Sequence, residues 1–144
     1  MTPRRTELEA AYFATSYFVD APGGRFGIRV GALSPQADAL ALEDRASTWA
    51  YVSAYNPGSI RASAEDNRRQ ACRLEQTVMS LGLRFLGGEG QGDDGAWPAE
   101  PSLLVLGVRL EDAVALARRF GQAAFVFGEC GRPARLVWTD PQPE

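Results

Sequence analysis

The sequence contains no histidine and no lysine, and all 15 of its basic residues are arginine. Catalysis by Ser-His-Asp or Cys-His groups, histidine-bound metals, Schiff-base chemistry and the phosphate-loop lysine are therefore excluded. Arginine stays protonated in proteins, so it cannot serve as an ordinary general base. An enzyme built on this chain would depend on Asp, Glu, Tyr, Ser or Cys side chains, assisted by arginine.

Cysteine is scarce too, with Cys72 and Cys130 as the two examples. These residues are far apart in the sequence and belong to no metal-ligand pattern. We therefore expect two buried or half-buried thiols. A disulfide and a catalytic thiol are the alternatives.

Long apolar runs are absent as well. No stretch approaches the roughly 18 apolar residues of a membrane-spanning helix, and no apolar segment of a signal peptide follows the first five residues. We therefore expect a cytoplasmic protein that does not associate with membranes. The net charge of −3 gives no general attraction to nucleic acid, which we do not expect as a partner.

The 144 residues, of which 45% are hydrophobic, are sufficient for one domain with its own core, and we expect a single domain over 1–144. Residues 48–127 read as strand, helix, strand, strand, helix, strand. This order predicts an α+β fold with a ferredoxin-like (split βαβ) sandwich core. The N-terminal extension, 1–47, adds a helix and a β-hairpin, and residues 128–144 add a C-terminal strand and tail. The expected strands are 17–19, 25–30, 48–55, 83–86, 102–108, 123–127 and 135–138, and the expected helices are 6–14, 36–44, 64–81 and 111–120.

Strand 48–55 is expected at the centre of the sheet. Its small apolar residues Ala50, Val52 and Ala54 share one face, which suits close packing by a helix. The other face carries Trp49, Tyr51, Ser53 and Tyr55. We expect its three aromatic side chains to be core beneath the N-terminal helix. The long helix begins at a Ser63 cap and has an apolar stripe of Ala71, Leu74, Val78 and Leu81, which places Asn67 on its inward face.

The ferredoxin-like order brings several segments to one end of the sheet. The first core strand ends there, the long helix begins there, and a long glycine-rich loop, 87–98, lies there. We therefore expect a polar pocket at this end. Its candidate ligand-binding residues are Tyr55, Asn56, Arg61, Asn67, Arg68, Trp97, Glu100, Ser102 and Gln122.

Short motifs at these positions occur in a fixed order: Ala54-Tyr55-Asn56-Pro57, Asn67-Arg68-Arg69, Gly88-Glu89-Gly90, Trp97-Pro98, Glu100-Pro101-Ser102, Phe120-Gly121-Gln122 and Ala124-Phe125-Val126. The ordered set resembles the bacterial domain-of-unknown-function family DUF3293 over nearly the whole chain. That family carries no established activity. The resemblance therefore implies one intact small domain and no mechanism.

The sequence leaves several functions open, most of them centred on this pocket. The favoured hypothesis is binding of a small anionic ligand or nucleotide, because Arg61, Arg68 and the start of the long helix could receive an anion. The alternative is a carboxylate-dependent, Mg²⁺-assisted hydrolase or nuclease, with Glu100 as the candidate catalytic group. Glu89, Asp93 and Asp94 are the weaker metal candidates, and no cofactor is expected. RNA binding on the sheet face is disfavoured by the acidic composition.

These residues also have a purely structural interpretation. Asn56 and Asn67 would tie down loops, Gln122 would cap a helix end, and the arginines would pair with nearby acids. The chain would then be a structural or interaction module. The oligomeric state stays open.

Overall fold

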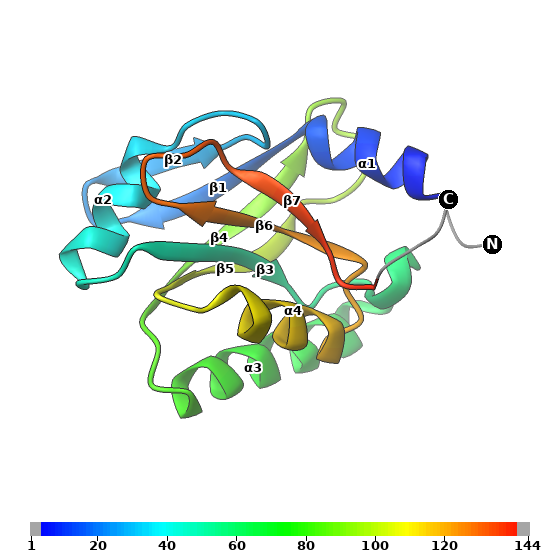
Figure 1. Ribbon diagram of the computed structural model, residues 1–144. Coiled ribbons are helices and arrows are strands. Elements are labelled where there is room, and N and C mark those ends of the chain that lie inside the picture. Colours follow the sequence, from blue (N-terminus) through cyan, green and yellow to red (C-terminus); the bar gives the residue numbers. More distant parts are fainter. Residues whose placement is uncertain (1–3, 141–144) are drawn as a thin grey trace.

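The computed structural model describes residues 4–140 and contains one curled sheet of seven antiparallel strands with four α-helices (Figure 1). The strands are β1 (Thr15–Ala21), β2 (Gly24–Ile28), β3 (Thr48–Ser53), β4 (Phe85–Gly92), β5 (Glu100–Leu106), β6 (Ala124–Glu129) and β7 (Arg135–Trp138). The helices are α1 (Arg5–Phe13), α2 (Pro35–Glu43), α3 (Ala64–Ser80) and α4 (Leu110–Arg119). The predicted mixture of helices and sheet is confirmed.

The strand order across the sheet is β2-β1-β4-β5-β3-β6-β7. β3 is an interior strand between β5 and β6, one place from the middle strand, β5, and its register pairs Tyr51 with both Leu104 and Val126. The N-terminal hairpin extends the sheet because β1 pairs with β4.

One face of the sheet is covered by α3 and α4, which lie together below it in Figure 1. Ala50, Val52 and Ala54 point to this side, where they meet Leu74 and Val78 of α3. Their small side chains allow the helices to lie close to the strand, and the result is a packed apolar core that also contains Phe120, Phe125 and Phe127.

The opposite, concave face carries Trp49, Tyr51 and Tyr17 in a second core cluster. Trp49 is fully buried, and its indole N–H donates to Asp38 Oδ1 of α2 at 2.9 Å. A β-carbon at Gly128, in the neighbouring β6, would overlap the Trp49 ring, so the glycine makes room for it. Helix α2 therefore closes this end of the concave face.

The glycine-rich loop predicted over 87–98 is partly wrong, because its first half continues β4 to Gly92. β4 pairs with β5 on one side and with β1 on the other. A β-carbon at Gly88 would overlap the Phe18 carbonyl oxygen, so the glycine permits the close approach of β1. Glycine is normally unfavourable in β-strands, but here the close contact between β4 and β1 requires it.

Smaller expectations also failed. Leu81 was placed on the inward stripe of the long helix, but it follows the helix end and its side chain is 54% exposed. Cys130 is half-buried as expected, whereas Cys72 is exposed, and both thiols are free. Among residues 4–140, no helix has the length and apolar character needed to cross a bilayer.

Candidate functional site

The chain turns sharply where β3 ends, and this turn builds one side of the site. Asn56 adopts a left-handed backbone conformation with φ of 49° and ψ of 62°, which asparagine tolerates better than most residues. Pro57 then begins a single turn of 3-10 helix, Pro57–Ser59. The backbone N–H of Gly58 donates to the Gly121 carbonyl at 2.7 Å, which joins this turn to the end of α4.

Two asparagine amides join the end of β3 to the start of α3. The Asn56 backbone N–H donates to Asn67 Oδ1 at 2.8 Å, and Asn67 Nδ2 donates to Asn56 Oδ1 at 2.9 Å. The Ala62 N–H also donates to Asn56 Oδ1, at 2.9 Å. Asn67 is buried as predicted, with 5% exposure, so its amide has a structural role in fixing the turn.

Glu100, at the start of β5, continues this network. Its Oε2 accepts hydrogen bonds from Asn56 Nδ2 and from Trp97 Nε1, each at 2.7 Å. Oε1 of Glu100 has no hydrogen-bond partner among residues 4–140. The carboxylate is therefore oriented by one oxygen and keeps the other available.

Gln122 fixes the end of α4 against the same turn. Its Nε2 donates to the Tyr55 carbonyl at 3.0 Å and to the Phe120 carbonyl at 3.2 Å. Both amide hydrogens are thus used, and Oε1 has no partner within the described part of the chain.

A cavity of about 520 Å³ opens beside these residues. It lies where β1, β5 and β6 begin and β3 and β4 end, and α1 and the loop 93–99 form its outer wall. All four tyrosines of the chain line it, together with Trp97. The remaining polar lining comes from Glu7, Thr15, Ser53, Asn56, Ser59, Asp93, Asp94, Glu100, Ser102 and Gln122.

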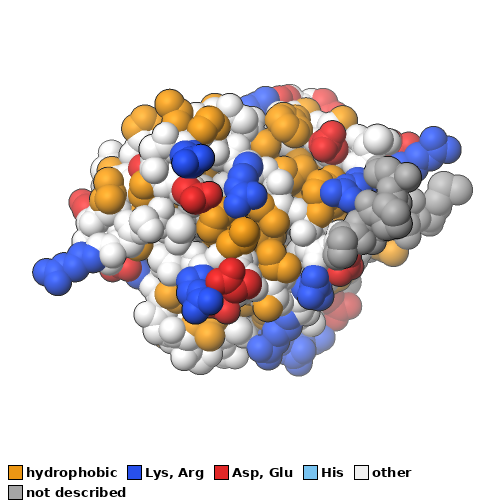
Figure 2. Space-filling model, viewed as in Figure 1, with side chains coloured by type: hydrophobic (Ala, Val, Ile, Leu, Met, Phe, Trp, Pro, Cys, Tyr) orange, Lys and Arg blue, Asp and Glu red, His pale blue; other side chains and the backbone are white. Residues whose placement is uncertain are grey.

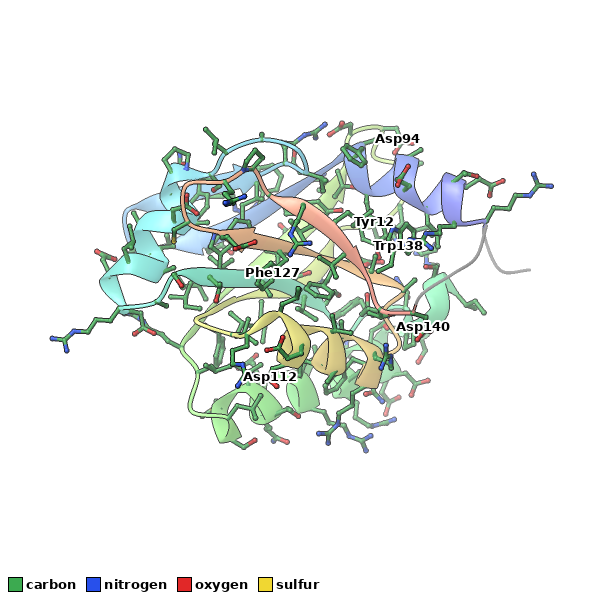
Figure 3. All side chains as sticks on the ribbon, in the orientation of Figure 1. Tyr12, Asp94, Asp112, Phe127, Trp138 and Asp140 are labelled. Carbon is green, nitrogen blue, oxygen red and sulfur yellow. The ribbon has the colours of Figure 1, made fainter. Side chains whose placement is uncertain are left out.

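Helix α1 reaches across the curled sheet to close this wall. The Tyr12 hydroxyl donates to the Ala124 carbonyl of β6 at 3.1 Å, and its ring meets the edge of Trp138 at 6.3 Å between centroids. Figure 3 shows Tyr12 and Trp138 side by side near α1, with Asp94 in the adjoining loop. Burial raises the pKa of Tyr12 to about 12, and the nearby Glu100 charge adds to this effect.

Tyr17 and Tyr51 form the deeper aromatic wall, with ring centroids 5.3 Å apart at 66°. Their hydroxyls donate to the Tyr12 carbonyl at 3.1 Å and the Phe18 carbonyl at 2.8 Å. Burial is the main cause that holds the pKa of both phenols well above the usual value. Both therefore stay neutral at physiological pH.

The structure brings together six of the nine residues predicted for the pocket: Tyr55, Asn56, Trp97, Glu100, Ser102 and Gln122. Asn67 lies behind Asn56 and does not line the cavity. Arg61 and Arg68 do not line it either, and the Arg61 guanidinium lies 5.7 Å from the Trp97 ring centroid. Figure 2 shows arginines interspersed with acidic and apolar side chains over most of the visible face.

Tyr12 and Tyr17 were absent from the predicted site because they belong to the N-terminal extension. The sequence offers no local signal that places them near Glu100. The position of Tyr12 depends on the curl of the sheet, and that of Tyr17 depends on the pairing of β1 with β4. Tyr51 was predicted as core beneath the N-terminal helix, and its alternation with Tyr55 along β3 is the signal that could have placed it in the cavity.

The weaker metal candidates, Glu89, Asp93 and Asp94, do not form a metal-binding cluster. Glu89 Oε1 accepts from Arg25 at 3.2 Å, and the Asp93 carboxylate receives Arg29 at 2.7 and 3.0 Å. The Arg29 guanidinium lowers the pKa of Asp93. Asp94 Oδ1 accepts the Ala96 N–H at 2.9 Å, as in an ordinary loop. No group of three or more acidic or cysteine side chains in the described ranges could hold a metal ion.

A family model described as a protein of unknown function, DUF3293, matches residues 52–125. The chain belongs to this family. The DUF3293 match runs from within β3 to the start of β6, a shorter range than the nearly complete one expected. It includes Asn56, Asn67, Glu100 and Gln122, whereas Tyr12 and Tyr17 lie outside it. No curated protein and no solved structure matches the chain.

Proposed function

We propose that the cavity at the end of the sheet binds a small molecule. The observation that carries this proposal is the cavity itself. Its volume of about 520 Å³ falls within the range of roughly 300–1,000 Å³ typical of ligand sites. Its wall is mainly aromatic and apolar, with a few convergent polar groups that would orient a ligand.

The proposed ligand differs from the anion expected from the sequence. That expectation depended on Arg61, Arg68 and the start of α3, and none of these lines the cavity. The lining carboxylates are Glu7, Asp93, Asp94 and Glu100, and the cavity wall formed by residues 4–140 contains no arginine. A neutral or cationic molecule suits these surroundings better than an anion.

Enzymatic use of Glu100 is the second candidate, favoured by one observation. The carboxylate lines the cavity and keeps Oε1 without a hydrogen-bond partner among residues 4–140, so it could accept a proton from a bound substrate. Asp93, a second carboxylate of the lining that could assist Glu100, is instead bound by Arg29. We therefore rank binding ahead of hydrolysis.

We also propose the finer architecture predicted from the sequence. Residues 48–127 would form a ferredoxin-like core, which the antiparallel order β4-β5-β3-β6 supports, within a single domain over 1–144. A cytoplasmic location is proposed as well, supported by two free cysteines that suit a reducing compartment.

Binding can be tested with a panel of small molecules, using ligand-observed NMR and thermal unfolding. A true ligand at 100 times its Kd should stabilise the fold by roughly 2.7 kcal/mol. Ala11→Trp should fill the cavity from α1 and abolish binding, because Ala11 lines it. Ala10→Trp is the matched control, since Ala10 is exposed on the same helix and outside the lining.

The proposal is overturned if no compound binds, or if Ala10→Trp and Ala11→Trp weaken binding equally. Loss of stability in both variants would require the same comparison with Ser102→Leu, which fills the cavity from β5. If all three variants bind a compound as tightly as the wild type does, the compound binds outside the cavity and the proposal is wrong.

A further inference from the structure

We infer that the ligand is a cation that donates hydrogen bonds, an amine attached to an apolar or aromatic body, and that Glu100 receives its charged group. The inference rests on the proposed function and adds the chemical class of the ligand. The inference follows from a comparison of the hydrogen-bond donors of the cavity with its acceptors, because most of the donors already bond within the protein.

Most side-chain donors that line the cavity are used by the protein itself. The amide of Gln122 gives both hydrogens to backbone carbonyls, and the Trp97 N–H is taken by Glu100. Six lining hydroxyls also donate to backbone carbonyls, those of Tyr12, Thr15, Tyr17, Tyr51, Ser53 and Ser102. Tyr55 and Ser59 carry the lining hydroxyls that have no acceptor among residues 4–140.

The acceptors show the opposite pattern. Oε1 of Glu100 and Oε1 of Gln122 have no donor within residues 4–140. Each engaged hydroxyl also keeps lone pairs, because it has spent its single proton. A ligand entering this cavity therefore meets mainly acceptors, and it must supply the donors.

The charge distribution points the same way. Arg29 neutralises Asp93, but Glu7, Asp94 and Glu100 form no ion pair in the described part of the chain. Besides Arg29, Arg61 lies close to a lining residue, with its guanidinium 5.7 Å from the Trp97 ring centroid. The three remaining carboxylates outnumber this one cation, so the cavity attracts positive charge.

The aromatic wall supplies the second recognition element. The faces of tyrosine and tryptophan rings attract cations, and quaternary or protonated amines are commonly held by several such rings. Tyr12, Tyr17, Tyr51, Tyr55 and Trp97 all line the cavity. Glu100 lies within this set, since Trp97 donates to it directly. A primary ammonium could therefore bind Glu100 Oε1 while its apolar body contacts the rings.

The test uses three probes that share one aromatic body: tryptamine, a cation; tryptophol, which is neutral; and indole-3-propionate, an anion. Affinities are measured by NMR titration at pH 7 and low salt. We expect tryptamine to bind roughly tenfold more tightly than the other two, and this preference to fall with added salt. Glu100→Gln should remove the preference by weakening tryptamine alone, while Glu9→Gln, on the outer side of α1, should not.

The variant Glu100→Gln keeps a side-chain oxygen that can accept from Asn56 and Trp97, so the protein should still fold. If this variant unfolds, the double variant Glu7→Gln with Asp94→Asn leaves the Asn56–Glu100–Trp97 hydrogen bonds intact and should still reduce the tryptamine preference. Equal or better binding of tryptophol or indole-3-propionate, abolished by Ala11→Trp, would overturn the cationic ligand and leave the proposed function standing. No binding by any probe or by the wider panel would overturn both.

Discussion

Two tryptophans on the concave side of the sheet each donate an indole N–H to a carboxylate, yet they lie in opposite surroundings. Trp49 is fully buried against Asp38 of α2, at 2.9 Å. Trp97 donates to Glu100 at 2.7 Å from a loop, and its side chain is 41% exposed. The Trp49–Asp38 pair closes one end of the concave face, and the Trp97–Glu100 pair borders the open cavity at the other end.

The difference lies in what fills the space around each ring. At the Trp49 end, the indole ring occupies the space that a side chain at position 128 would need, and that position is glycine. The Gly131 N–H donates to the second carboxylate oxygen of Asp38 at 2.9 Å. At the Trp97 end, the space beside the ring stays open as the cavity, and Glu100 keeps one carboxylate oxygen without a hydrogen-bond partner among residues 4–140. The first end is therefore filled by packed side chains, whereas the second keeps an open cavity.

Replacing the two tryptophans should give the largest contrast. Trp49→Ala removes a fully buried ring and should lower the free energy of unfolding by about 3–5 kcal/mol. Trp97→Ala removes an exposed ring and should cost roughly 1 kcal/mol or less. Urea denaturation of both variants measures the difference, and similar losses would show that the two ends do not differ in the way described.

Gly128→Ala tests whether the closed end is filled to its limit. The added methyl group would overlap the ring of Trp49, which is fully buried, so we expect a loss of about 1–3 kcal/mol in the free energy of unfolding. Gly87→Ala is the matched control, because a β-carbon there meets no atom within 4 Å. A Gly128→Ala protein as stable as the control would mean that the Trp49 end can expand.

Asn67→Ala tests the hydrogen bonds beneath the open end. The change leaves the Asn56 backbone N–H without its acceptor, and a buried unsatisfied donor costs about 1–3 kcal/mol. Gln76→Ala, at an exposed position of α3, should stay within roughly 0.5 kcal/mol of the wild type. If thermal unfolding of the two variants coincides, the paired amides do not fix the end of β3.

The tyrosines of the cavity should give an effect on stability that appears only at high pH. Free tyrosine titrates near 10, whereas burial raises the pKa of Tyr12 to about 12. Between these values the unfolded chain loses a proton that the folded chain keeps, so stability falls as pH rises. Each such tyrosine contributes about 1.4 kcal/mol per pH unit over its own window. Stability measured from pH 9 to 12 should fall less steeply in Tyr12→Phe, and parallel curves would contradict this account.

The features predicted correctly from the sequence depend on neighbours along the chain. The alternation of β3 separated Ala50, Val52 and Ala54 from the aromatic face, and the Ser63 cap correctly marked the start of α3. Helical spacing also placed Asn67 inward. Each of these follows from a period or a cap that a few residues determine.

The features that failed depend on partners far away in the sequence. The glycines of β4 read as a loop, because the approach of Phe18 that requires Gly88 cannot be seen locally. Arg61 and Arg68 were assigned to the pocket from their place beside α3, although the cavity opens on the side of α1. Tyr12 reaches the site only because the sheet curls and brings β6 within hydrogen-bond distance.

The closed set of bonds among Asn56, Asn67 and Glu100 has a consequence for how mutations combine. Asn56 bonds to both Asn67 and Glu100, Glu100 also accepts from Trp97, and Asn56 also accepts from the Ala62 backbone. None of these bonds involves a tyrosine side chain. Energetic coupling follows shared partners, so changes within the set should be strongly non-additive. Changes at Tyr17 or Tyr51 should add independently to them, which would let the aromatic wall vary in shape while the end of β3 stays fixed.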